Sequence, residues 1–170
     1  VNDMILYTDF YRLDYVREFE NHFSYALGFK KWTQSPAGGL LYNDATSGNT
    51  VNQVNTTEFS VGLRYAQNEK FYQGKIYRVP IVDRYPVYNL RYTAGIKGLL
   101  GGQYNYHNIM GSIDKRFYLS QLGYSDVTVE GGYIAGKAPF PLLAIHRANQ
   151  TYAYQLNSYN LMNFLEFVSD

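Results

Sequence analysis

The feature of this sequence that most constrains its fold is a two-residue alternation of apolar and polar side chains. It is clearest in the segment TEFSVGLRYAQ, residues 57–67, where every second position is apolar: Phe59, Val61, Leu63 and Tyr65. The positions between them hold polar or small residues: Glu58, Ser60, Gly62 and Arg64. Because successive side chains of an extended strand point to opposite faces, this segment is predicted to be a strand with one apolar face.

The same pattern recurs along the chain. HFSYALGFK (22–30), PVYNLRYTAG (86–95) and DVTVEGGYIAG (126–136) alternate clearly, 104–119 does so less regularly, and 2–13 is strand-like with ambiguous sides. We therefore expect six strands, with a seventh starting near Phe164. No amphipathic helical period of useful length is present, so the sequence predicts an all-β fold, an antiparallel meander.

The connections between these segments are uneven in length. Short links are expected at 17–21, 97–102 and 120–124, and long ones at 35–55, 67–85 and 137–160. Strands of about ten residues suit a transmembrane β-barrel, whose strands need roughly 9 to 11 residues. A soluble β-sandwich shows the same alternation, usually in strands of about five or six residues. The pattern alone leaves both architectures open.

The composition narrows the class of protein. The chain has 19 Tyr, 10 Phe and a net charge of +1, and it has no Cys. Tyr collects where apolar and aqueous media meet, whereas a balanced charge gives no reason to expect nucleic acid as a partner. No run of ~18 apolar residues predicts a transmembrane helix. A mean hydropathy of -0.34 is compatible with barrel strands, because half of their residues face water.

The stretch VEGGYIAGKAPF, residues 129–140, has the glycine and lysine spacing with which a phosphate-binding loop begins. Such a loop needs Ser or Thr after the lysine and a helix start, but Ala138 follows Lys137, and Pro139 and Pro141 flank the next residue. No nucleotide is therefore expected. We interpret the glycines as residues that let a curved strand bend, with Lys137 at the aqueous border of the membrane.

Catalysis and metal binding have little support in the sequence. His22, His107 and His146 share no ligand spacing with acidic residues. Ser125, His146 and Asp170 are the residue types of a Ser-His-Asp catalytic triad, but no nucleophile-elbow motif surrounds any serine. We expect no enzyme activity, no metal and no cofactor.

The run KRFYLSQLGYSDVTVEGGYIAGKAPFPLLAIHRANQTYAYQLNSYNLMNFLEFVSD, residues 115–170, resembles a family of large Bacteroidota outer-membrane proteins of unknown function. Those proteins join an N-terminal carboxypeptidase-regulatory-like domain to a C-terminal barrel, and residues 57–81 and 85–102 resemble upstream strands of that barrel. More weakly, GGYIAGKAPFPL and FLEFVSD resemble the Omp85-type barrel segment in which a long loop folds into the lumen. The Arg-Gly-aromatic loop tip of that superfamily is missing, because Ala148 follows Arg147.

The resemblance implies that residues 1–170 form a partial barrel domain of six to seven strands, incomplete at both ends, in the outer membrane of a Gram-negative bacterium. Its implied function is a non-enzymatic scaffold or a component of translocation or assembly. A soluble β-sandwich that binds a ligand in the cell envelope is the alternative. The expected partners are outer-membrane lipid and other envelope proteins.

The candidate functional residues are polar side chains expected in the lumen. On the strands they share the polar face: Glu58, Arg64, Arg91, Thr128 and Glu130. The loop 137–163 is expected to fold inward over the lumen, against Glu130 and Thr128. Arg147 is its candidate to bind a carboxylate through two hydrogen bonds.

Overall fold

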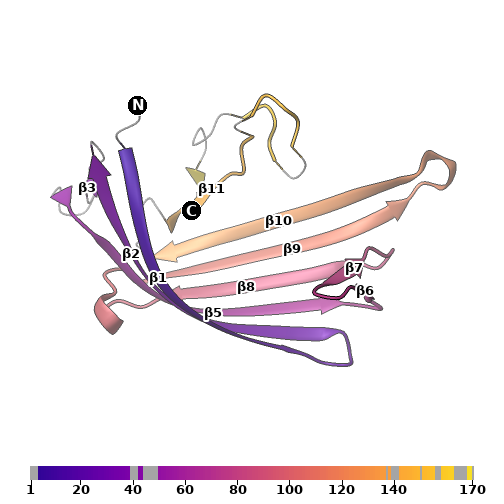
Figure 1. Ribbon diagram of the computed structural model, residues 1–170, viewed down its shortest axis with the longest axis horizontal. Helices are drawn as coiled ribbons and strands as arrows, with labels where there is room; N and C mark the ends of the chain where they lie inside the picture. Colours follow the sequence, from indigo (N-terminus) through magenta and orange to yellow (C-terminus); the bar gives the residue numbers. More distant parts are fainter. Residues whose placement is uncertain are drawn as a thin grey trace.

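The computed structural model describes residues 4–38, 42–43, 50–136, 138, 142–149, 151–155, 158–162 and 168–169. Its main element is one six-stranded antiparallel sheet in which the strands follow chain order (Figure 1). The strands are β1 (Met4–Glu18), β2 (Phe23–Gly38), β5 (Val54–Ala66), β8 (Val87–Gly95), β9 (Tyr106–Tyr118) and β10 (Tyr124–Gly136). The predicted all-β antiparallel meander is confirmed.

Small elements occupy the connections. Three two-stranded ladders pair β3 (Tyr42–Asn43) with β4 (Thr50–Val51), β6 (Lys70–Gln73) with β7 (Arg78–Ile81), and β11 (Ala144–Ile145) with β12 (Val168–Ser169). Two 3-10 turns, η1 (Leu99–Gly101) and η2 (Ser120–Leu122), precede β9 and β10. Within the described ranges, no helix has the length and apolar character needed to cross a membrane.

Several boundaries differ from those expected. β1 and β2 reach 15 and 16 residues, because they pair along their whole length, from Met4 opposite Gly38 to Glu18 opposite Ser24. Beyond Gln34, β2 no longer pairs with β5, and this one-sided stretch accommodates Pro36, which has no N–H to donate. The seventh strand expected near Phe164 lies outside the described residues. The following pair, Val168–Ser169, joins β11 and not the main sheet.

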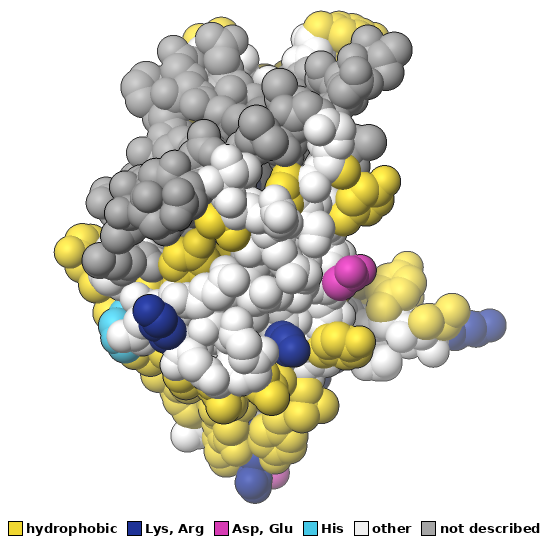
Figure 2. All heavy atoms as spheres, turned by 90° about the vertical axis from the view of Figure 1, so that its left-hand side faces the viewer, with side chains coloured by type: hydrophobic (Ala, Val, Ile, Leu, Met, Phe, Trp, Pro, Cys, Tyr) yellow, Lys and Arg dark blue, Asp and Glu magenta, His cyan; other side chains and the backbone are white. Residues whose placement is uncertain are grey.

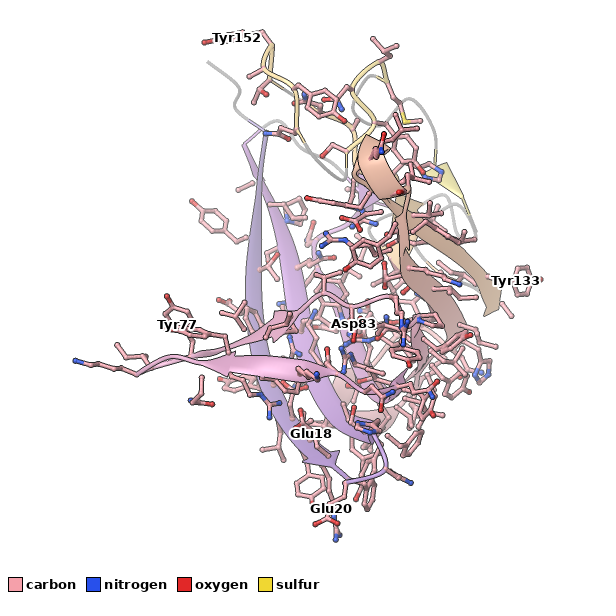
Figure 3. All side chains as sticks on the ribbon, turned by 90° about the vertical axis from the view of Figure 1, so that its right-hand side faces the viewer. Glu18, Glu20, Tyr77, Asp83, Tyr133 and Tyr152 are labelled. Carbon is pink, nitrogen blue, oxygen red and sulfur yellow. The ribbon has the colours of Figure 1, made fainter. Side chains whose placement is uncertain are left out.

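The register separates the two faces of the sheet. Five directly paired residues on β2, β5, β8, β9 and β10 form one apolar row: Leu27, Val61, Tyr92, Ile109 and Tyr133. The next row points to the opposite face and is mostly polar: Gly28, Ser60, Thr93, Asn108 and Ile134. Tyr133 projects away from the molecule in Figure 3, and hydrophobic side chains gather on the lower side of Figure 2. The alternation in sequence thus becomes an apolar face and a polar face.

The best-packed region lies where the 96–105 connection folds back on β5. The Ile96 N–H donates to the Thr57 carbonyl (2.9 Å), and the Thr57 hydroxyl donates to the Leu99 carbonyl (2.9 Å). Most of the buried side chains collect at this end of the sheet: Gln34, Val54, Thr56, Thr57 and Tyr106. This connection therefore anchors the ends of β5, β8 and β9 to one another.

Candidate functional site

The polar face of the sheet carries all five strand residues that the sequence singled out. Arg64 lies in the same row as Glu130, linked through Asn89 and Ser112. Arg91 lies two residues further along β8 than Asn89, on the same face and opposite Gly62, and Glu58 lies further along β5, opposite Gly95. The structure places these residues on one face, but no hydrogen bond or ion pair joins them directly to one another; most of them bind other neighbours.

Glu58 is the centre of an aromatic cluster. Its carboxylate accepts hydrogen bonds from the Trp32 indole N–H (2.8 Å) and from the Tyr106 hydroxyl (2.5 Å). The Lys30 ammonium lies 3.7 Å from the centre of the Trp32 ring, on the strand directly paired with Glu58. Tyr106 is only 3% exposed, and its ring lies over Gly95, which has no side chain to obstruct it. The cluster joins β2, β5, β8 and β9 across the polar face.

Arg64 belongs to a second group, which fixes the β6–β7 hairpin. Its guanidinium donates two hydrogen bonds to Glu69, at 2.7 and 2.5 Å, just before β6. At the other side of the hairpin, Arg78 on β7 donates to both oxygens of Glu18 on β1, at 2.6 and 2.8 Å. Figure 3 shows the hairpin passing in front of the strands, with Tyr77 near β1 and Glu18 below it. These pairs bind the hairpin at two points.

A cavity of about 590 Å³ lies between this hairpin and the polar face. Its floor consists of two rows on the polar face, which lie two residues apart along each strand. One row supplies Val16, Ala26, Gly62, Arg91 and Met110, and the other supplies Glu18, Ser24, Arg64, Asn89, Ser112 and Glu130. Phe71, Arg78 and Pro80 of the hairpin form its roof. Its volume lies within the ≈300–1,000 Å³ range of small-molecule sites.

Arg147 lies in the segment after β10 and contacts Glu130. The contact is a single hydrogen bond from Nη2 to Oε2, not the two bonds expected, and 61% of the Arg147 side chain is exposed. The hydrogen bond to Glu130 raises the pKa of the Arg147 guanidinium. The Thr128 hydroxyl donates to Asp114 at 2.7 Å and not to Arg147. The segment therefore touches the polar face of β10 at Glu130.

This segment is also held by its own hydrogen bonds. The Tyr159 N–H donates to the Arg147 carbonyl (2.8 Å), and the Asn149 N–H donates to the Tyr159 carbonyl (3.1 Å). The Asn149 side chain donates to the Asn160 side chain (2.7 Å). Lys137 and positions 139–141, 150, 156–157 and 163 of the expected 137–163 loop lie outside the described residues.

The remaining candidates are not brought together. Ser125 lies near the start of β10, the His146 ring stands edge-on to Tyr159 at 6.0 Å, and Asp170 lies outside the described residues. His107 bonds the Tyr92 hydroxyl through Nδ1 at 2.7 Å. Within the described ranges, no three His, Asp or Glu side chains form a group that could hold a metal ion.

Sequence reasoning missed four residues that organise the polar face: Glu18, Trp32, Arg78 and Tyr106. Trp32 is the single Trp of the chain, and it lies two residues from Lys30 on an alternating segment, which is a usable signal. The pairing of Glu18 with Arg78 depends on how the hairpin folds over the sheet, which no local sequence pattern predicts.

These observations define a class of protein: an all-β chain built on a single amphipathic meander sheet, with ion pairs and a roofed cavity on its polar face. The chain belongs to the family of unknown function (DUF5686), C-terminal domain, whose family model matches residues 2–169. No curated protein and no solved structure matches the chain.

Proposed function

We propose that this chain forms part of the wall of an outer-membrane β-barrel, with its apolar face against lipid and its polar face toward the lumen. In this role it is a non-enzymatic scaffold or a component of translocation or assembly, in the envelope of a Gram-negative bacterium. The resemblance to Bacteroidota and Omp85-type barrels points the same way.

The observation that carries the proposal is the chemistry of the apolar face. Across β2, β5, β8, β9 and β10, four consecutive outward positions on each strand hold no Asp, Glu, Lys or Arg; these positions lie between 23 and 29, 59 and 65, 88 and 94, 107 and 113, and 129 and 135. On β5, β8, β9 and β10 the large apolar side chains among them are well exposed, from 37% at Tyr92 to 63% at Tyr133, whereas on β2 Phe23, Tyr25 and Phe29 are half-buried. Soluble monomers rarely expose such a continuous apolar surface, whereas a bilayer accommodates it.

The borders of this apolar face also suit a membrane. Phe23, Tyr65 and Tyr88 form an aromatic row at one end, and Phe29 and Phe59 pair at the other, with ring centres 5.0 Å apart. Six residues separate the two rows, which is about 20 Å along a strand and close to the ≈25 Å apolar band of outer-membrane barrels. Aromatic side chains are enriched at both membrane–water interfaces.

The polar face has the complementary property. Its charged side chains form cross-strand and hairpin pairs, such as Arg116 with Asp126 (2.6 Å) and Arg64 with Glu69 (2.5 Å). Backbone groups in hydrocarbon must be paired, so the free edges of β1 and β10 have to meet further strands. Six strands are also too few to close a barrel, because bacterial single-chain barrels have about eight strands or more. The proposal therefore includes strands beyond these six.

The second candidate is a soluble β-sandwich module that binds a ligand in the envelope, and the roofed cavity is the observation that favours it. In that case a second protein layer, not lipid, would cover the apolar face.

The test uses the same substitution on opposite faces of one strand. Val61 lies in the centre of the apolar face, and its neighbour Ser60 points to the polar face. In the full-length protein, Val61→Arg should abolish or strongly reduce outer-membrane insertion, because Arg at the bilayer midplane costs ≈2–4 kcal/mol. Ser60→Arg should be tolerated. Fractionation and folding yield measure both outcomes. Recovery of Val61→Arg in the outer membrane at parental levels, or of the parent protein in the soluble fraction, would refute the proposal.

A further inference from the structure

The cavity beneath the β6–β7 hairpin is lined by charged side chains, and one of them has no partner of opposite charge among the described residues. Each of the three carboxylates that line it is bound by an arginine: Glu18 by Arg78, Glu69 by Arg64, and Glu130 by Arg147. Arg91 also lines the cavity but has no hydrogen-bonded or ion-paired partner within the part of the chain that the structure describes. The wall itself holds as many arginines as carboxylates, but Arg147 neutralises Glu130 from outside the lining, so Arg91 is the arginine left without a counter-charge in the described ranges.

The residues around Arg91 leave space for a ligand. Its direct strand partner is Gly62, whose own partner on β2 is Ala26, so the floor on this side of Arg91 is made of small residues. Met110 pairs with Arg91 on the other side. A Cβ added at Gly62 would meet the Ala26 Cβ at 3.6 Å, an ordinary van der Waals contact, so no bulky side chain fills this part of the floor.

The part of the hairpin that lines the cavity is largely apolar. Phe71 and Pro80 of the hairpin face the cavity, and the Arg78 guanidinium lies 3.9 Å from the centre of the Phe71 ring while it binds Glu18. The space thus combines Arg91 with an apolar part of the roof and with Ala26, Gly62 and Met110 beside it, while the second row of the floor is polar. Sites for small ligands commonly combine apolar surface with a few fixed polar groups.

We propose that this cavity is a binding site for a small organic carboxylate, with its head on Arg91 and its apolar body between Met110 and the hairpin roof. A carboxylate matches the planar guanidinium, and its single negative charge equals the uncompensated charge. A doubly charged phosphate ester would leave one negative charge among the wall carboxylates. This inference goes beyond the proposed barrel role and does not depend on membrane insertion.

Equilibrium dialysis of radiolabelled hexanoate against the full-length protein in detergent tests the site, with protein-free micelles as the blank. Hexan-1-ol and hexan-1-amine serve as competitors of the same length with different charge. We expect saturable hexanoate binding that neither competitor displaces, and a loss of about ten- to hundredfold in affinity for Arg91→Gln, the range of a charge-assisted contact. Arg12→Gln is the matched control, because Arg12 pairs with Asp14 outside the cavity and should leave the affinity unchanged.

A second variant keeps the charge and removes the space. Gly62→Val fills the floor and should lower the affinity for hexanoate. Acetate has almost no apolar body, and it should still compete for the site in the parent protein. Circular dichroism of each variant establishes that it is folded. The proposal is overturned if Arg91→Gln binds hexanoate like the parent, if hexan-1-ol competes as well as hexanoate, or if folded parent protein shows no saturable binding.

Discussion

Replacing Gly95 with Ala should test the aromatic cluster around Glu58 with a single methyl group. A Cβ at Gly95 would lie 2.1 Å from Cε1 and 2.4 Å from Cδ1 of Tyr106. Ordinary contacts between carbon atoms are ≈3.5–4.0 Å, so the ring would have to retreat by more than 1 Å. The Tyr106 ring is buried and has little room for this movement.

The expected cost follows from two effects. Forcing extra volume into a packed site costs about 1–3 kcal/mol, and moving the ring weakens the 2.5 Å hydrogen bond from the Tyr106 hydroxyl to Glu58. A hydrogen bond to a charged group contributes about 1.5–3 kcal/mol. Since Trp32 still donates to Glu58, we expect Gly95→Ala to lower the free energy of unfolding by about 3 kcal/mol.

Urea unfolding of the full-length protein in micelles, followed by circular dichroism, measures this loss. With a slope of about 2 kcal/mol/M, the midpoint should fall by about 1.5 M. Gly131→Ala is the matched control, because Gly131 also lies in the main sheet and a Cβ added there meets nothing within 4 Å. Its midpoint should stay near that of the parent.

A double-mutant cycle identifies the cause. In a Tyr106→Ala background, Gly95→Ala should cost less than about 0.5 kcal/mol, because the ring that it displaces is gone. If Gly95→Ala destabilises no more than Gly131→Ala, or if its cost persists without the Tyr106 ring, the reasoning fails.

Two further predictions concern the segments that contact the polar face. Arg78→Gln should increase the rate of proteolysis at the exposed hairpin tip several-fold, whereas Arg12→Gln should not; global stability should hardly change, because the Arg78–Glu18 pair is solvent-exposed. Equal proteolysis of both variants would show that this pair does not hold the hairpin. Arg147→Ala removes the contact with Glu130 and should raise the conductance of small solutes through the reconstituted full-length protein; unchanged conductance would contradict a plug role for this segment.

The strands and their faces could be predicted because two-residue alternation is a local property. The segment containing Val61 shows this, since its apolar and polar positions occupy opposite faces in the structure. The β6–β7 hairpin could not be predicted in the same way. Its strands are four residues each, Pro80 interrupts the second, and all eight positions are exposed, so no alternation marks them.

Contacts within the candidate site were harder to predict than positions on a face. The two-residue alternation is enough to place Glu58 on the polar face. Its hydrogen bonds to Trp32 and Tyr106, however, depend on the register of three strand pairings. A shift of one residue in any pairing would send the partner to the other face. The contact of Arg147 with Glu130 depends on the path of the segment after β10, which strand patterns do not describe.

The chain-order meander has a consequence for how the sheet folds. Each strand pairs with the strand that precedes it in the main sheet, so each pairing closes only the connection between them, and the entropy lost on closure is small. The sheet can therefore grow by adding one strand at a time, starting from a tight hairpin such as β1–β2. The Glu18–Arg78 pair joins residues 60 positions apart and can form only after β2 and β5 are in place. Its formation would mark a late step in folding, when the hairpin settles onto a sheet that already exists.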